Sequence, residues 1–230
     1  GGQTSVGNIE IADLMAEENG RRIPWGDQPL RLSFDVSETP QGLAVNRLAC
    51  ESPFLQLNGR GTLADFSAQM QFDLDRLVQE VGRFFDLQGV QLAGTGAGQL
   101  QLRRGNDGVF GANGTFDVTN FRFALPGDRA WEEHLVRFKL DANGLIEEGS
   151  SGRRLAELHA ATASIESSGE QVVVQLAKPV FKINSATSWP LSARVANGNL
   201  ANWTLRLKPW IALGTWQAAG VCNATATATV

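Results

Sequence analysis

The chain has 230 residues, 43% of them hydrophobic, which is enough for one large all-β domain or two ordinary domains. Its formal net charge is -4 and its Lys and Arg residues are scattered singly, so no basic stripe is available to neutralise a nucleic-acid backbone. The chain opens Gly-Gly-Gln-Thr, without an initiator Met, an apolar signal segment or an apolar run of membrane-spanning length. We therefore expect a segment of a longer protein.

Apolar and polar residues alternate along most of the chain, which predicts strands with one apolar face and one wet face. A short helix is also expected at Ile11 to Glu18. Asn-Gly pairs supply turn chemistry, either as hairpin turns or, inside an alternating run, as bulges. The sequence thus predicts an all-β fold, mainly an antiparallel meander of about ten to twelve strands. The clearest alternating runs are 30–36, 66–74, 110–118, 136–142, 172–176 and 203–207.

One segment departs from this period and predicts a short amphipathic helix near 75–86. Its apolar residues stand at positions i, i+1, i+4, i+7 and i+8 beginning from Leu77, which gives a wide apolar stripe. Asp73 or Asp75 can cap the start, and Gly82 weakens the middle by roughly 1 kcal/mol relative to alanine. The residues expected to cover an apolar surface are Leu77, Val81, Phe84 and Phe85.

Three glycines follow this helix at alternate positions of the next predicted strand: Gly94, Gly96 and Gly98. Glycine inside a strand marks a bend, a bulge or the close approach of another backbone. A ligand lying against bare backbone is the alternative. The run lacks the Lys-Ser/Thr of a nucleotide-binding loop, so phosphate-loop chemistry is excluded.

One sequence motif occurs twice in the chain. Gly61–Gln71 reads GTLADFSAQMQ and Gly198–Lys208 reads GNLANWTLRLK, 137 residues later (198 minus 61). Each copy has a glycine, a leucine two residues on, an Asp or Asn, an aromatic residue and an alternating run. We interpret the two copies as one structural unit used twice, each continuing as a strand.

Residues able to carry catalysis or bind metal do not form a recognisable motif. Cys50 and Cys222 are interpreted as free, buried thiols, and they could form a disulfide only if the fold brings them together. His134 and His159 have no ligand-spaced partner, which excludes a zinc motif. The acid-rich stretch 132–134 is interpreted as the solvated start of a strand. We expect no metal, no cofactor and no enzymatic activity.

Three segments follow one another in the chain: the helical stretch Asp73–Leu87, the glycine-punctuated strand Val90–Leu102 and the G-x-F-x-V-x-N-F pattern of Gly114–Phe121. Together they resemble the repeating unit of the AsmA/TamB-like envelope proteins. The resemblance covers about Phe54 to Leu125 and returns, without the helix, from about Leu191. In this second copy a Pro- and Trp-containing segment, 209–216, stands where the helix was.

The resemblance implies a curled or elongated sheet, or trough, with an apolar inner face that shields or conducts lipid acyl chains between two membranes. It implies the periplasm or cell envelope of a diderm bacterium and a role in outer-membrane biogenesis. The implied partners are phospholipid acyl chains and neighbouring repeats of the same polypeptide, with a membrane anchor outside this segment. The expected units are 1–53, 54–189 and 190–230. The expected apolar-face residues are Phe66, Met70, Phe72, Leu92, Leu100, Phe116, Phe138, Trp203, Leu205 and Leu207.

The alternative is a compact two-sheet sandwich of an adhesin or carbohydrate-binding class. The tryptophans near the end of the chain, Trp189, Trp203, Trp210 and Trp216, could then stack on sugar rings. They could also fill a core or groove, or lie at a membrane interface.

Overall fold

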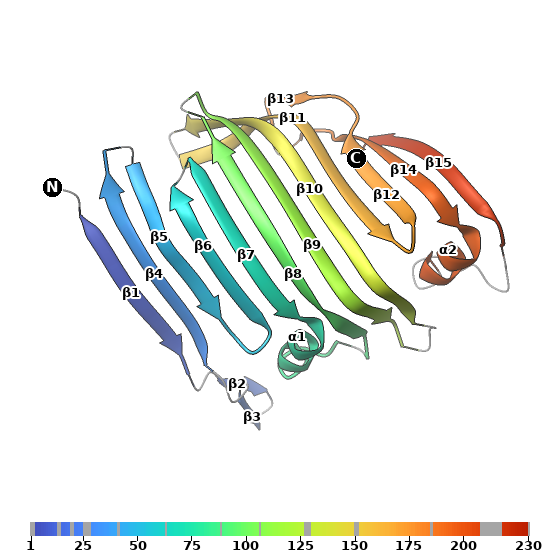
Figure 1. The fold of residues 1–230 in the computed structure, drawn as a ribbon, viewed down its shortest axis with the longest axis horizontal. Coiled ribbons are helices and arrows are strands. Elements are labelled where there is room, and N and C mark those ends of the chain that lie inside the picture. The colour runs from blue at the N-terminus through green and yellow to red at the C-terminus, as the bar shows by residue number, and fades with distance from the viewer. Residues whose placement is uncertain are drawn as a thin grey trace. The chain divides into compact units, whose positions relative to one another are not determined.

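The structure is a computed structural model, and it is dominated by β-strands (Figure 1). Its strands are β1 (Thr4–Ile11), β2 (Met15–Glu18), β3 (Arg21–Pro24), β4 (Leu30–Thr39), β5 (Gly42–Glu51), β6 (Leu55–Thr62), β7 (Asp65–Asp73), β8 (Gln91–Arg104), β9 (Val109–Ala124), β10 (Trp131–Gly149), β11 (Gly152–Ser167), β12 (Glu170–Leu176), β13 (Val180–Phe181), β14 (Pro190–Asn199) and β15 (Val221–Thr229). Its helices are α1 (Leu74–Val81) and α2 (Leu200–Leu207). The structure describes residues 3–12, 15–18, 21–24, 29–40, 42–62, 64–87, 89–105, 107–126, 130–149, 152–184, 186–207 and 218–229.

The described strands form one 13-stranded sheet and a separate two-stranded ribbon, β2–β3. The order β1-β4-β5-β6-β7-β8-β9-β10-β11-β12-β14-β15 follows the chain, with β13 paired beside β11. The described strands pair antiparallel, as expected for a meander of short connections. The predicted all-β fold is confirmed, with more strands than expected. The described strands are not divided between two large sheets, as the sandwich alternative requires.

Two compact units divide the chain: Gly1–Gln99 with Val118–Leu135, called unit 1, and Leu100–Asp117 with Val136–Val230, called unit 2. Their bounds differ from those expected from the resemblance, which stay a prediction. Helix α1 belongs to unit 1 and α2 belongs to unit 2. Each unit is therefore described by itself.

Two local predictions are wrong. The helix expected at Ile11 to Glu18 is absent: β1 ends at Ile11 and Met15–Glu18 is a strand. Ile9 and Ile11 alternate along β1 and lie opposite Leu32 and Leu30 of β4, so pairing with β4 stabilises this segment as a strand. The second error concerns the run 203–207, which was predicted as a strand and lies in helix α2.

Turn residues act in two ways. Ser168 and Gly169, with φ of +50° and +78°, form the tight turn of the β11–β12 hairpin. Asn143 and Gly144 lie at a register shift between β10 and β11, and Asn197, with φ of +54°, lies at a shift between β14 and β15. The Asn-Gly pairs inside long strands therefore act as bulges, which is one of the two roles predicted for them.

Apolar side chains of the sheet are only partly buried. Among the described residues Val136 is fully buried, and most other buried hydrophobic residues are small: Ala49, Ala68, Val118, Ala124, Ala156 and Val180. Large apolar side chains of the sheet therefore remain accessible.

Candidate functional site

In unit 1, the pairing of strands brings apolar residues to one face of the sheet. Leu32 lies between Ile9 on β1 and Cys50 on β5. Leu57 lies between Cys50 and Met70 on β7. Since strand residues alternate between faces, the same pairings define the unit 1 apolar face. Its residues are Ile9, Ile11, Leu30, Leu32, Phe34, Val36, Leu43, Val45, Leu48, Cys50, Leu55, Leu57, Phe66, Ala68, Met70 and Phe72.

Unit 2 has a face of the same kind. Val172 lies between Ile165 on β11 and Val195 on β14, and it alternates along β12 with polar Gln171 and with Val173. The apolar residues that share the side of Val172 form what we call the unit 2 apolar face. Its residues are Val136, Phe138, Leu140, Ala142, Ala161, Ala163, Ile165, Val172, Val174, Leu176, Leu191, Ala193, Val195, Ala224, Ala226 and Ala228.

Side chains on these faces are substantially exposed. In unit 1, Ile9 is 48% exposed and Leu43 is 42% exposed. In unit 2, Leu140 is 44% exposed and Val174 is 38% exposed. In a one-domain soluble protein the apolar face of an antiparallel sheet packs on a core, so exposure of a contiguous apolar row marks an interaction surface.

The opposite face of unit 2 carries ion pairs. Arg137 donates two hydrogen bonds to Asp117, from Nε to Oδ1 at 2.8 Å and from Nη2 to Oδ2 at 3.0 Å. These bonds hold the pKa of Asp117 below its ordinary value and raise the pKa of Arg137. The contact also orients the neighbouring residues: Phe116 and Phe138, each beside a partner of this pair, point to the other face.

The structure locates several of the residues predicted for the apolar face. Phe66, Met70 and Phe72 belong to the unit 1 apolar face and are half-buried. Leu92 and Leu100 are half-buried on β8, beside exposed glutamines in the same strand.

Helix α1 closes one end of the unit 1 sheet (Figure 1). It begins at the end of β7 because the Asp73 carboxylate accepts a hydrogen bond from the Arg76 backbone N–H at 3.0 Å. In the first turn of the helix, Asp75 Oδ2 accepts a hydrogen bond from the Gly94 N–H of β8 at 3.0 Å. Gly94 has φ of +128°, and a Cβ there would lie 2.9 Å from the Thr119 carbonyl oxygen. Glycine at position 94 therefore allows the backbones of β8 and β9 to approach closely, as one interpretation of the glycine run predicted.

The predicted cover residues of α1 divide into two groups. Leu77, Val81 and Phe84 are half-buried, as expected for residues that pack on the sheet. Phe85 is 66% exposed, so its predicted covering role is wrong. The helix ends at Val81, four residues before Phe85, because Gly82 follows as its C-cap and the backbone then turns.

Helix α2 is held to unit 2 by a buried carboxylate. Glu170, at the start of β12, is 5% exposed. Its Oε1 accepts hydrogen bonds from Asn199 N at 3.2 Å and from Asn202 Nδ2 at 3.0 Å. Its Oε2 accepts a short hydrogen bond from Arg206 Nη1, and the Arg206 side chain is 10% exposed. A buried charge of this kind requires its partner. Sequence patterns missed this cluster because its members lie far apart in the chain.

Trp203, Leu205 and Leu207, predicted for the apolar face of a strand, are instead in α2. Leu200 follows Asn199, whose Oδ1 accepts hydrogen bonds from Ala201 N at 3.0 Å and Asn202 N at 3.4 Å, which starts the helix. The side chains of Leu205 and Leu207, and the segment 208–217 with its two tryptophans, lie outside the described residues.

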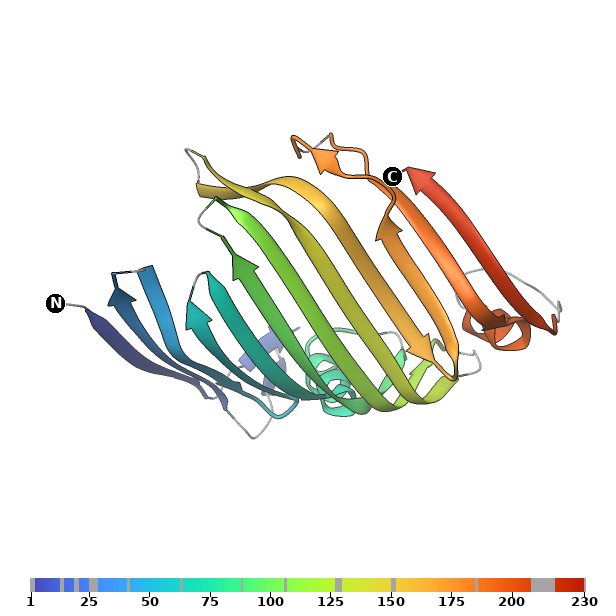
Figure 2. The ribbon, with the colours of Figure 1, turned by 45° about the horizontal axis from the view of Figure 1, so that its top comes forward.

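The Trp203 indole lies over Gly198 of β14. A Cβ on Gly198 would lie 2.9 Å from Trp203 Nε1 and 2.9 Å from Cys222 Sγ. The Arg206 guanidinium carbon is 5.8 Å from the centre of the Trp203 ring, which adds a cation–π contact. Trp203 therefore packs from α2 onto Gly198 of β14, and Figure 2 shows α2 at the end of this strand. In this position it is not a free platform for sugar stacking.

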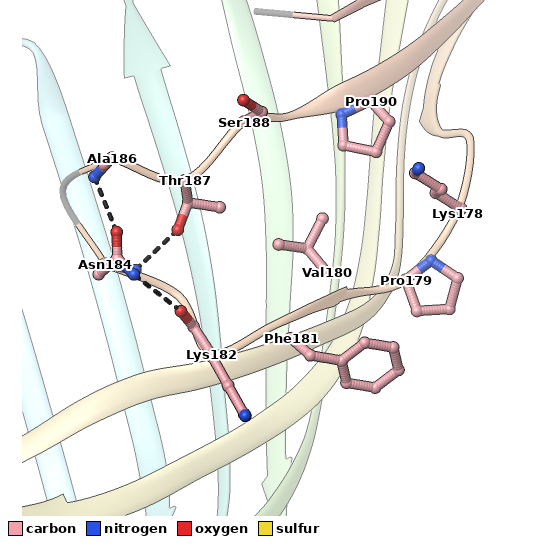
Figure 3. Close-up of a pocket in the computed structure, with 10 residues that line it drawn as sticks. All are labelled: Lys178, Pro179, Val180, Phe181, Lys182, Asn184, Ala186, Thr187, Ser188 and Pro190. Atoms are coloured by element: carbon pink, nitrogen blue, oxygen red, sulfur yellow. Dashed lines mark hydrogen bonds between the residues drawn. The ribbon is translucent and has the colours of Figure 1, made fainter.

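The far end of β12 leads into a loop with a cavity. This loop, residues 177–189, is called the Lys178 loop, and Ser185 lies outside its described residues. The Ala177 N–H donates to the Pro190 carbonyl at 2.8 Å, which closes the loop at its base. Within it, Asn184 N donates to Thr187 Oγ1 at 2.7 Å. The loop borders an open, shallow cavity of about 490 Å³, into which Val180 points (Figure 3).

Residues considered for catalysis do not converge in the described parts of the chain. Glu133 is buried and accepts a hydrogen bond from Trp131 Nε1 at 2.9 Å, so this part of the solvated stretch 132–134 is wrongly predicted. Glu132 pairs with Arg122 at 3.4 Å, and His134 is exposed.

The described His, Cys, Asp and Glu residues form no cluster that could hold a metal ion. Cys50 on β5 and Cys222 on β15 are free, as predicted, and both are half-buried where full burial was expected.

Comparison with protein-family models, curated proteins and solved structures found no match. Neither helix in the described part of the chain is long and apolar enough to cross a membrane.

Proposed function

We propose that this chain is a non-enzymatic β-sheet segment whose apolar faces shield lipid acyl chains in the periplasm or cell envelope of a bacterium with two membranes. The observation that carries this proposal is the pair of apolar faces, each built from aliphatic side chains that alternate with polar ones and remain exposed. The assignment to the envelope rests on the resemblance to AsmA/TamB-like proteins and on their role in outer-membrane biogenesis.

The dimensions of unit 2 suit an acyl chain. From Glu170 to Leu176, β12 extends about 20 Å at the usual rise per residue. One leaflet of a bilayer has a hydrocarbon thickness of roughly 15 Å, half that of the whole core. An acyl chain can therefore lie along these strands, and each methylene that leaves water contributes about 0.8 kcal/mol.

The outermost strands support the proposal that neighbouring repeats of the same polypeptide are partners. Among the described strands, β15 pairs with β14 alone and leaves its other edge free. From Val221 to Thr229 it carries no charged residue and no proline, the devices that usually protect an exposed edge. A further antiparallel strand can continue the sheet at this edge.

Lipid binding by two valine variants tests the proposal. Val173 and Val174 are neighbours on β12, and the register places Val174 on the apolar face and Val173 on the opposite face. We expect native mass spectrometry to detect phospholipid on the purified protein, with binding reduced several-fold in Val174→Asn and retained in Val173→Asn. A protein that binds no phospholipid, or two variants with equal effects, would contradict the proposal.

A further inference from the structure

The cavity of the Lys178 loop has an uncompensated positive charge. Among the described residues that line it, the charged ones are Lys178 and Lys182, and none is acidic. Both lysines are exposed, and neither forms an ion pair with a described residue. Figure 3 shows them on different sides of the Val180 side chain, and the exposed Lys182 side chain extends away from Thr187. Two ammonium groups around one cavity attract an anion.

Lys182 has an unusual backbone conformation. Its φ is +55°, in the left-handed region that is unfavourable for a residue other than glycine. Hydrogen bonds on either side hold it there: Asn184 Nδ2 donates to the Lys182 carbonyl at 3.2 Å, and Ile183 N donates to the Ala156 carbonyl at 3.0 Å. The turn takes Lys182 out of the alternation of β13. Strain of this kind often marks ligand sites.

The cavity lies at one end of the unit 2 apolar face. Val180 of β13 lies opposite Leu158 of β11, and Leu158 lies opposite Gly144, two residues along β10 from Ala142 of that face. Helix α2 is at the other end, since Glu170 begins β12 and Leu176 ends it beside the loop. A molecule that lies along the unit 2 apolar face therefore has one end near Lys178 and Lys182 and the other end near α2.

We propose that the Lys178 loop binds a phosphate ester, with Lys178 and Lys182 as its cationic contacts. The Thr187 hydroxyl, which accepts a hydrogen bond from Asn184 N, keeps its proton to donate to the same anion. The inference rests on the proposed function, because an acyl chain on the unit 2 apolar face brings a phosphate group of the same molecule to the lysines. A free phosphate ester could also bind there.

Calorimetric titration with three compounds tests this inference. Dihexanoyl phosphatidylglycerol carries acyl chains and phosphate, dihexanoylglycerol carries the chains alone, and glycerol 3-phosphate carries the phosphate alone. The variant Lys178→Gln/Lys182→Gln removes two charges from the loop. Lys139→Gln/Arg194→Gln is the matched control, since it removes two charges from exposed residues on the polar face of unit 2.

The wild-type protein should bind the phosphatidyl compound roughly tenfold more tightly than the diacylglycerol, as expected for charge-assisted hydrogen bonds. The loop variant should lose this preference and the control should keep it. Lysine-dependent binding of glycerol 3-phosphate would support the site with a free phosphate ester as its source.

Equal affinity for the two acylated compounds, or a preference that persists in the loop variant, would overturn the phosphate site and leave the proposed function intact. Failure of both acylated compounds to bind would contradict the proposed function, and glycerol 3-phosphate would still report on the loop.

Discussion

The two helices begin in the same way and are held to the sheet by different forces. Helix α1 follows Asp73 in the sequence Asp-Leu-Asp-Arg-Leu, and α2 follows Asn199 in Asn-Leu-Ala-Asn-Trp, 126 residues later (199 minus 73). Both capping residues bond the backbone N–H three positions on. Beyond this, α1 contacts a backbone N–H of β8 through Asp75, whereas α2 contacts the buried Glu170. The same capping motif can therefore start two helices that are held to the sheet by different contacts.

The two copies of the repeated motif, Gly61–Gln71 and Gly198–Lys208, give a second comparison. Thr62 in the first copy corresponds to Asn199 in the second. The Thr62 hydroxyl accepts hydrogen bonds from Ala64 N at 3.1 Å and Asp65 N at 2.9 Å, the same two positions that the Asn199 amide bonds. The first copy then continues as β7, because Phe66 lies opposite Gly61 in the sheet. The repeated motif therefore encodes a turn. Contacts with the rest of the fold then decide whether the residues after the turn form a strand or a helix.

The largest expected effect comes from the attachment of α2. Arg206→Met leaves Glu170 buried without its charged partner, which should destabilise unit 2 by about 3 to 5 kcal/mol. Urea denaturation measures the change. Arg194→Met, at an exposed position on β14, is the control and should change stability by less than about 0.5 kcal/mol.

Glu170→Gln/Arg206→Met should recover much of this loss, because it removes the unpaired charge as well. A loss of stability in Arg206→Met no larger than in Arg194→Met would show that the ion pair does not hold α2.

The attachment of α1 should be broken by a single methyl group. Gly94→Ala places a Cβ against the Thr119 carbonyl at a positive φ, and we expect a loss of roughly 2 kcal/mol. Gly111→Ala is the control, since no atom lies within 4 Å of the added Cβ. Thermal unfolding of both variants checks the prediction. Equal stability of the two proteins would mean that Gly94 is not needed for the approach of β8 to β9.

The caps should contribute equally despite the different attachments. Asp73→Ala and Asn199→Ala each remove an acceptor for helix N–H groups, at a cost of about 1 kcal/mol. Hydrogen exchange of the first-turn amides measures each helix separately. A much larger effect at Asn199 than at Asp73 would show that the cap and the Glu170 contacts act as a unit.

The smallest effect concerns pH. Arg137 lowers the pKa of Asp117 in the folded state, so the pair stabilises the protein above the unfolded-state pKa of about 4 and loses this contribution as the pH falls through the lower folded-state pKa. Asp117→Asn should therefore differ most from wild type at neutral pH and least in acid. Chemical denaturation at several pH values measures this difference, with the exposed Asp141→Asn as control. A difference that grows on acidification would contradict the sign of this linkage.

The sequence predicted the strands well because period-two alternation reflects the two faces of the sheet. Leu32, Met70 and Val172 each stand in such a run and each lie on an apolar face. The α1 helix was also predictable, since Asp73 and the 3.6-residue period beyond it are local signals.

The rest depended on distant contacts. Residues 203–207 alternate as a strand does, and the partners that favour the helix, Glu170 and Gly220, are 20 or more residues away from the residues of α2 that they bond. Tertiary contacts overrode the local pattern there. Likewise, the Lys178 loop carries no periodicity, so the lysines were recognisable only once β13 was placed beside β11.

The most direct test of the account is photo-crosslinking from neighbouring positions on β12. A photoreactive phenylalanine analogue replaces Val174 in one protein and Val173 in another, and each protein is irradiated with phospholipid vesicles. The account predicts a lipid adduct, seen by mass spectrometry, from position 174 and little from position 173, because the two residues face opposite sides of the sheet. Adducts of equal yield from both positions, or from neither, would contradict the claim that the apolar face holds acyl chains.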